Sequence, residues 1–255
     1  MRRVFFFLFS LVLLGVGTIL AQDSNSYLIE GDAAYDKLDN ESALKFYQLA
    51  YKSDTTLCEA AWKISRAMVD IGELSEKAKQ EEYYLDAEKW SHKSIRLCPD
   101  LAKAHLSLAI AVGRVALISG KKKQVELSTV VKQSCERALE LDPNDDIAHH
   151  VYARWHRKVA NLSGIQKTFA KILYGGLPKA SNEQAIEHFQ KAIALKPNYI
   201  NHHLELGITY QEMDQFALAK SEYEKIADLP ITDSEDPDHK KDALVRLAEV
   251  EKKLK

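Results

Sequence analysis

The fold is decided by residues 198–231, which read NYINHHLELGITYQEMDQFALAKSEYEKIADLPI. Gly207 and Ala219 are small where two antiparallel helices would touch, and Tyr223 fills the space beside them. Pro230 ends the second helix, because proline has no amide donor and its ring clashes with the preceding turn. This stretch therefore predicts one helical hairpin with a repeat length of about 34 residues.

The second half of the pattern recurs upstream, at the spacing expected for the second helix of each hairpin. It is found as Ala185-x3-Phe189-x2-Ala192-x4-Pro197, Val131-x3-Cys135-x2-Ala138-x4-Pro143, Ala87-x3-Ser91-x2-Ser94-x4-Pro99, and Ala43-x3-Tyr47-x2-Ala50 after Gly31. Units of this kind in register resemble the tetratricopeptide repeat (TPR), whose hairpins stack on one another. We therefore expect an all-α, TPR-like helical-hairpin superhelix, that is, an α-solenoid.

The repeats are longer than usual, because Pro143 follows Pro99 by 44 residues and Pro197 follows Pro143 by 54. The extra residues fall between first and second helices, near 72–83, 115–127 and 159–181. The first two insertions are charged and compatible with longer helices, whereas the third contains several glycines and must include a loop.

These spacings divide the chain into a targeting segment, five units and a closing helix. The predicted bounds are 1–21 for a signal peptide, 22–57 for TPR-like unit 1, 58–100 for elongated unit 2, 101–144 for elongated unit 3, 145–197 for unit 4 with the insertion 159–181, 198–231 for TPR unit 5, and 236–255 for an amphipathic capping helix. The last helix starts at Asp236-Pro237 and would cover the final repeat.

Residues 1–21 have the composition of a cleavable signal peptide. Arg2 and Arg3 precede an apolar run, and Ala21-Gln22 offers a cleavage point. We therefore expect the protein to be exported, either to the periplasm or by secretion. The alternative keeps residues 4–21 as a membrane anchor, because this run is close to the length that spans a bilayer. Only in that case is a membrane expected as a partner.

The bulk composition excludes several classes of function. Lys and Arg number 35 against 37 Asp and Glu, so no nucleic-acid partner is implied. The sequence has no HExxH motif, no paired Cys/His spacing and no GxSxG motif. We therefore expect no metal site, no cofactor and no catalytic residues, and the protein is not expected to be an enzyme.

The three cysteines are Cys58, Cys98 and Cys135. An odd number argues against a full disulfide framework, and the favoured interpretation is three small buried side chains. The alternative is a bridge between Cys58 and Cys98, because one begins an expected helix and the other ends its antiparallel partner.

The first helices of TPR units line a concave groove. In register, that face carries aromatic and cationic side chains, namely Trp62, Arg66, Arg114, His150, Arg154, Arg157 and Lys158. Arginine forms paired hydrogen bonds with carboxylates, so the expected partner is a protein or peptide segment, and an acidic one would fit the cluster. The favoured interpretation of the individual residues is nevertheless that the charges pair with neighbouring Glu and Asp, and that the tryptophan packs between helices.

The third insertion contains a basic amphipathic stretch. Beside Lys167 and Lys171 it carries an apolar stripe of Ile165, Phe169, Ile172 and Leu173. The favoured interpretation is a helix that docks on the array through this stripe. The alternatives are a flap that adds the two lysines to the groove and a helix that lies on a membrane surface.

The elongated pattern also resembles a known family. The segments that carry the likeness are Trp62-x-Ile64-Ser65-Arg66-Ala67, the charged run 73–89 and the stretch 164–181 with Leu177-Pro178. Over about residues 58–230 they resemble the regulator of microtubule dynamics family. The resemblance implies a TPR-like domain that binds proteins and, in animal members, association with microtubules or membrane contact sites. Because export would keep the chain away from microtubules, that role is not carried over.

Overall fold

The computed structural model describes residues 23–174, 176 and 178–255, and the predicted signal peptide lies outside them. Within these residues the chain forms twelve α-helices and no strand. In chain order they are α1 (Ser24–Tyr35), α2 (Asn40–Ser53), α3 (Cys58–Leu74), α4 (Lys77–Leu97), α5 (Ala102–Ile118), α6 (Lys121–Leu141), α7 (Asp146–Ala160), α8 (Gly164–Tyr174), α9 (Asn182–Leu195), α10 (Ile200–Glu212), α11 (Phe216–Ile226) and α12 (Asp236–Lys253). Among these described helices, none has both the length and the apolar character needed to cross a membrane.

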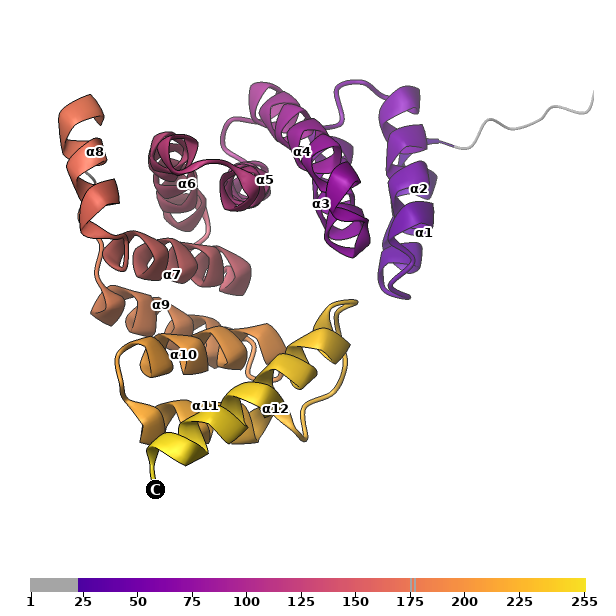
Figure 1. Cartoon of the computed structure of the whole chain (residues 1–255). Helices are drawn as coiled ribbons and strands as arrows, with labels where there is room; N and C mark the ends of the chain where they lie inside the picture. Colours follow the sequence, from indigo (N-terminus) through magenta and orange to yellow (C-terminus); the bar gives the residue numbers. More distant parts are fainter. Residues whose placement is uncertain (1–22, 175, 177) are drawn as a thin grey trace, which may run out of the picture.

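The helices pair as hairpins that stack into a curved array (Figure 1). The pairs are α1 with α2, α3 with α4, α5 with α6, α7 with α9, and α10 with α11. The last helix, α12, packs against α11 and α10. The predicted α-solenoid with a C-terminal capping helix is therefore confirmed. The boundaries drawn between its units stay predictions.

The structure accommodates the extra residues of the long repeats in two ways. Helices α4 and α6 have 21 residues each, and their partners α3 and α5 have 17 residues each. The third insertion instead forms the separate helix α8, followed by a turn in which Gly176 has a φ of 128°. That backbone conformation is open to glycine but strained for other residues.

A glycine in the first helix lies against a tyrosine ring of the second helix in three of the described hairpins. The pairs are Gly31 with Tyr47, Gly72 with Tyr84, and Gly207 with Tyr223. A Cβ atom added at Gly72 would lie 2.7 Å from Cε1 of Tyr84, which is well inside van der Waals contact. The helices therefore approach this closely only because glycine has no side chain, as the sequence predicts for Gly207.

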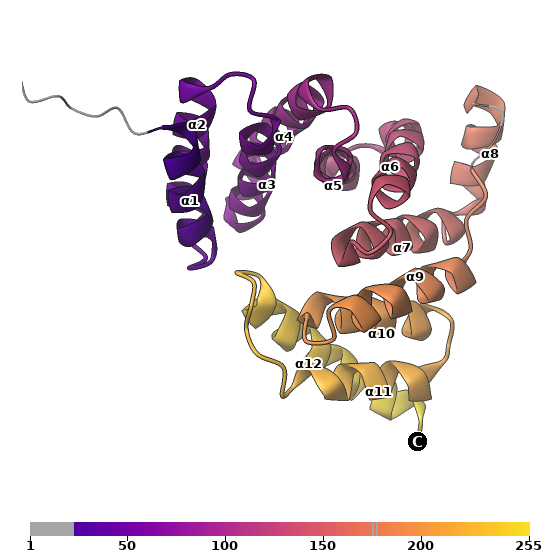
Figure 2. The same cartoon turned by 180° about the vertical axis from the view of Figure 1, so that it is seen from behind.

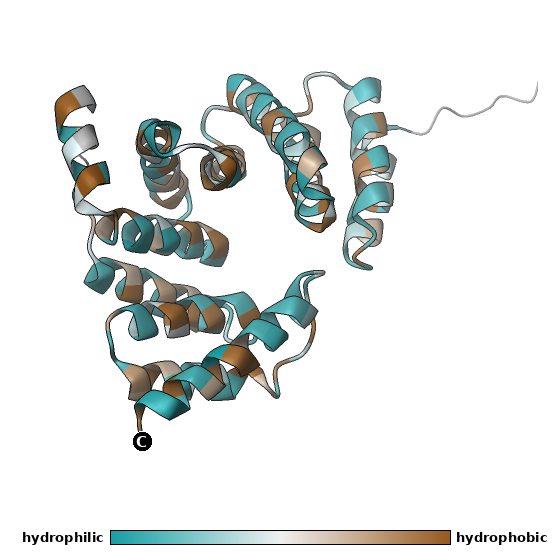
Figure 3. Ribbon diagram, in the orientation of Figure 1, coloured by the Kyte–Doolittle hydropathy of each residue, from teal (hydrophilic) through white to brown (hydrophobic). Residues whose placement is uncertain are grey.

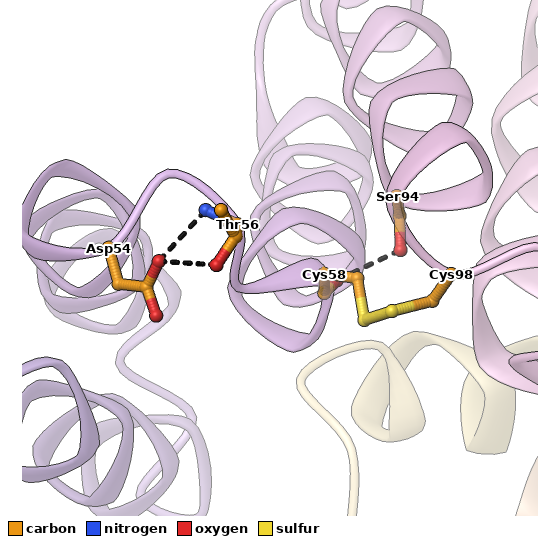
Figure 4. The surroundings of a disulfide bond; sticks show 5 residues. All are labelled: Asp54, Thr56, Cys58, Ser94 and Cys98. Carbon is orange, nitrogen blue, oxygen red and sulfur yellow. Dashed lines mark hydrogen bonds between the residues drawn. A yellow bond between two sulfur atoms is a disulfide. The ribbon is translucent and has the colours of Figure 1, made fainter.

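Cys58, the first residue of α3, and Cys98, which follows α4, form a disulfide (Figure 4). Their Cα atoms lie 6.0 Å apart. Ser94 Oγ donates a hydrogen bond of 2.9 Å to the carbonyl of Cys58 at the same end of the hairpin. The favoured interpretation of three unlinked cysteines is therefore wrong for this pair, while Cys135 is free and buried.

Helix α8 stands at the edge of the array, where it contacts α6, and it carries hydrophobic residues (Figure 3). Ile165 and Ile172 are 72 % and 73 % exposed. These two members of the apolar stripe therefore do not pack on the array, contrary to the favoured interpretation. The side chains of Phe169 and Leu173 lie outside the described part of the structure.

Candidate functional site

The first helices of the hairpins enclose a central cavity of about 1140 Å³. Helices α1, α3, α5, α7 and α10 all contribute to its wall. Residues 232–235, here called the closing segment, precede α12 and line the cavity opposite α1 and α3 (Figure 2). The α5 part of the wall is largely apolar, through Leu106, Ile110 and Leu117. The cavity therefore has an apolar side and a side that is rich in charged groups.

The structure brings most of the predicted groove residues to this cavity. Those in its wall are Trp62, Arg66, Arg114, His150, Arg154 and Lys158. Arg157 is 1 % exposed and lies outside the wall. Lys167 and Lys171 line a separate hollow of about 430 Å³, so the insertion does not add its lysines to the central cavity. A binding role for each of these residues stays a prediction.

Two of the arginines are engaged by one carboxylate. Arg154 Nε lies 3.2 Å from Glu205 Oε1, and Arg157 Nη2 pairs with Glu205 Oε2. Arg157 Nη1 also donates a 3.1 Å hydrogen bond to the Glu205 carbonyl. Burial alone would raise the Glu205 pKa, but the two guanidinium groups outweigh it and hold the pKa far below its usual range. This buried ion cluster joins α7 to α10.

The cationic and aromatic side chains at the α1–α3 end contact one another. The Arg66 guanidinium lies 3.6 Å from the centroid of the Tyr35 ring and 5.0 Å from that of Trp62. Its Nη2 donates a 3.1 Å hydrogen bond to the Tyr47 hydroxyl. Stacking of this kind orients the guanidinium at little cost in hydration, because the arginine plane is weakly hydrated.

Carboxylates of the closing segment face carboxylates of α3, an arrangement that the sequence analysis missed. Glu73 pairs with Arg114, and Glu235 lies 3.9 Å from the same guanidinium. Burial and a hydrogen bond with Glu235 raise the pKa of Glu73 to about 9. Glu73 therefore holds its proton more strongly than an exposed glutamate does, with the Glu235 carboxylate and the Arg114 guanidinium beside it.

The second carboxylate of the closing segment contacts a tyrosine. Tyr199 Oη, just before α10, donates a 2.9 Å hydrogen bond to Asp233 Oδ2. Burial and the Asp233 charge raise the pKa of Asp70 on α3 to about 7. The signal in the sequence was the group of acidic residues Asp233, Glu235 and Asp236, of which the sequence analysis used only Asp236, as the start of the last helix.

His150 belongs to a set of histidine pairs between α7 and its neighbours. His150 Nδ1 lies 3.0 Å from His202 Nδ1, and His202 Nε2 lies 3.1 Å from Asp146 Oδ2. Because the carboxylate accepts from Nε2, the His202 Nδ1 accepts from His150. His149 and His188 form a similar contact of 2.8 Å between their Nδ1 atoms. Among the described residues, no three metal-ligating side chains are placed to hold an ion.

We expect acid to weaken the α7–α9 interface through His188, whose pKa burial and His149 lower to about 4. The unfolded chain, with a histidine pKa of about 6.5, binds more protons than the folded protein between these values. This contribution is complete above pH 6.5 and is lost as the pH falls toward 4. For a half-buried side chain we expect a loss of roughly 1–2 kcal/mol between pH 7 and pH 4.5.

Urea unfolding of the wild type and of His188→Gln at the two pH values measures this loss. The variant should lose less stability on acidification by that amount. His92→Gln, on the outer helix α4, serves as the control and should behave as the wild type does. An identical pH dependence in the wild type and in His188→Gln would show that the buried histidine pair is not responsible.

Comparison with known proteins gives one consistent group of relatives. The profile of the family described as Regulator of microtubule dynamics protein 1-3 matches residues 27–251. Regulator of microtubule dynamics protein 1 of Bos taurus is 29 % identical over 214 residues, which cover 82 % of this chain and 66 % of that protein. The Mus musculus protein of the same name is 29 % identical over 196 residues, which cover 75 % and 63 %. The chain thus spans less than two thirds of the length of these relatives.

Solved structures share the fold at low sequence identity. A TPR protein of Thermus thermophilus superposes with a TM-score of 0.64 and 15 % identity, over 87 % of this chain and 99 % of that chain. Yeast Tom70 superposes with a TM-score of 0.57 and 14 % identity, over 91 % and 40 %. At such identities the likeness concerns the α-solenoid alone.

The relatives overturn the expected export. They are named as regulators of microtubule dynamics, and microtubules are polymers of the cell interior. The prediction of a periplasmic or secreted protein with a cleavable signal is therefore wrong. It rested on an apolar run after two arginines, a pattern that is not specific to cleaved signals, and residues 1–21 lie outside the described residues. Export was the reason for not carrying over the microtubule role from the family, so that reason no longer applies.

Proposed function

The chain belongs to the regulator of microtubule dynamics family, and we propose that it is a non-catalytic scaffold that binds a segment of a partner protein in its central cavity. TPR-like arrays of this kind are generally interaction scaffolds, because stacked hairpins present one extended concave surface. The predicted groove residues that line the cavity, from Trp62 on α3 to Lys158 on α7, would form the charged and aromatic part of that surface.

The observation that carries the proposal is the cavity itself. Its volume of about 1140 Å³ is above the range of roughly 300–1,000 Å³ that is usual for small-molecule pockets. Leu117 on α5 is 50 % exposed in its wall, so an apolar side chain is available for contact. An apolar wall opposite charged groups suits an amphipathic protein segment, whose two faces need different surroundings.

The test is selection of binders from a displayed peptide library, followed by fluorescence anisotropy with the purified protein. We expect Leu117→Glu to weaken the selected peptides at least tenfold, because it places a charge in the apolar wall. Ile29→Glu is the matched control, since Ile29 is 62 % exposed on α1 and lies outside the cavity. Peptides that bind both variants as well as the wild type would refute binding in the cavity.

A second candidate function is regulation of microtubules, favoured by the names of the relatives. The same two variants separate it from peptide binding. If co-sedimentation with microtubules survives Leu117→Glu while peptide binding is lost, the microtubule contact lies outside the cavity.

A further inference from the structure

We propose that the closing segment, residues 232–235, occupies a binding site for acidic peptides inside the central cavity. A partner segment with two carboxylates two residues apart would bind there by displacing it. The inference rests on the proposed function, because it names the chemistry of the partner and the way in which access to the cavity is controlled.

The closing segment already makes the contacts expected of such a ligand. Asp233 accepts a 2.9 Å hydrogen bond from the Tyr199 hydroxyl, and Glu235 lies 3.9 Å from the Arg114 guanidinium. Both receiving groups lie in the cavity wall, Arg114 on α5 and Tyr199 immediately before α10. An incoming acidic segment would find the same hydrogen-bond donor and the same cation once residues 232–235 move away.

The segment is pre-shaped, which keeps its two carboxylates at a fixed spacing. Asp236 Oδ2 accepts hydrogen bonds from the Thr232 and Asp233 amides, at 2.7 and 2.8 Å. Asp233 Oδ1 accepts a third, from the Glu235 amide at 3.1 Å. These bonds tie the segment to Asp236, the first residue of α12, and so fix the spacing of its two carboxylates.

The chain leading into the closing segment holds it only loosely. The connection between α11 and the segment is mostly exposed, with only Leu229 half-buried. Its exposed residues are Ala227, Asp228, Pro230 and Ile231. Moving such a connection uncovers little apolar surface, and regions of this kind open at low cost in free energy.

Like charges also oppose closure. Glu235 faces Glu73, and Asp233 faces Asp70, so four carboxyl groups share the region with Arg66 and Arg114. Each ionisation brings negative charges together in a partly buried place, which weakens the internal contact. The hydrogen bond between Glu73 and Glu235 holds the closing segment while Glu73 is protonated, and ionisation of Glu73 or Asp70 weakens that hold.

An internal competitor acts through its effective concentration. A segment tethered by a short connection is present at about millimolar effective concentration, so it lowers the apparent affinity of the cavity for any external ligand that needs the same groups. Removing its carboxylates should therefore raise the affinity of the cavity for an acidic peptide by roughly tenfold, without changing the groups that receive the peptide.

The experiment uses a fluorescent peptide with the sequence of residues 231–236, ITDSED, and its neutral counterpart ITNSQN. Fluorescence anisotropy compares the wild type with the double variant Asp233→Ala/Glu235→Ala. We expect the acidic peptide to bind the double variant about ten times more tightly than it binds the wild type, and the neutral peptide to bind neither. Asp238→Ala/Glu224→Ala, which removes two exposed carboxylates outside the cavity, should bind as the wild type does.

Adding Tyr199→Phe to the double variant tests the receiving side while keeping the ring in place. It should cancel most of the gain, and Arg114→Gln in the same background should do likewise. The inference would be overturned if the wild type and the double variant bound the acidic peptide equally well. It would also be overturned if replacing Tyr199 or Arg114 left the affinity of the double variant unchanged. If library peptides still lost affinity for Leu117→Glu, the proposed function would stand although this inference had failed. The failure of the inference can therefore be distinguished from the failure of the proposed function.

Discussion

Glu205→Gln is expected to lower the free energy of unfolding by about 3–5 kcal/mol, because it removes the negative partner of two arginines. Arg157 is buried and bonds both the side chain and the carbonyl of Glu205. Arg154 contacts the other carboxylate oxygen at 3.2 Å. Without that charge, the buried Arg157 guanidinium loses its main partner between α7 and α10, and its burial keeps it from the water that would compensate.

Chemical denaturation at pH 7 measures this loss. Glu224→Gln is the matched control, because Glu224 forms an exposed pair with Lys220 on α11, and its loss should cost less than about 1 kcal/mol. The triple variant Arg154→Met/Arg157→Met/Glu205→Leu should recover most of the stability, since it leaves no unpaired charge. If Glu205→Gln costs no more than Glu224→Gln, the cluster does not hold the hairpins together.

The hairpins could be predicted because their determinants are local. Gly207 and Tyr223 are 16 residues apart within one repeat, and the same relation joins Gly31 to Tyr47. In the second, third and fourth units a helix-ending proline follows at a fixed distance, so these units can be recognised without knowledge of their neighbours. The extra length of α6 followed from the spacing between Pro99 and Pro143 for the same reason.

The pairing of the groove charges could not be predicted, because it depends on how the hairpins rotate relative to one another. Arg157 and Glu205 are 48 residues apart, on the first helices of successive units. Helical register places both near the concave side but cannot say whether they meet. The favoured interpretation, in which the arginines pair with nearby acidic residues, applies to Arg114, Arg154 and Arg157, although their partners could not be named.

The closing segment was missed for a related reason. The small rotation between successive repeats adds up along the array, and this sum brings residues 232–235 opposite α1 and α3. No short-range pattern encodes it. The contacts of Asp233 and Glu235 thus arise from the curvature of the whole solenoid, and their function is the least accessible to sequence analysis.

Replacing both bridging cysteines, Cys58→Ser/Cys98→Ser, is expected to cost about 2–4 kcal/mol of stability. The bridge closes a loop with a sequence separation of 40 residues. Cross-linking a loop of this length removes entropy from the unfolded chain that corresponds to about 4 kcal/mol in the chain-entropy model. The cost should fall on the second hairpin, where the bridge joins the start of α3 to the end of α4, so hydrogen exchange should quicken there first.

Thermal unfolding of the wild type and of the double variant, each with and without a reducing agent, measures this cost and includes its own control. Reductant should destabilise the wild type by the same amount and leave the double variant unchanged, because the remaining thiol of Cys135 forms no bridge. A thiol assay on the unfolded, unreduced wild type should detect only that cysteine. The prediction would be wrong if the assay detected all three thiols and reductant did not change the stability of the wild type. Ser94 and the packing of α3 on α4 would then hold this end of the hairpin without a covalent link.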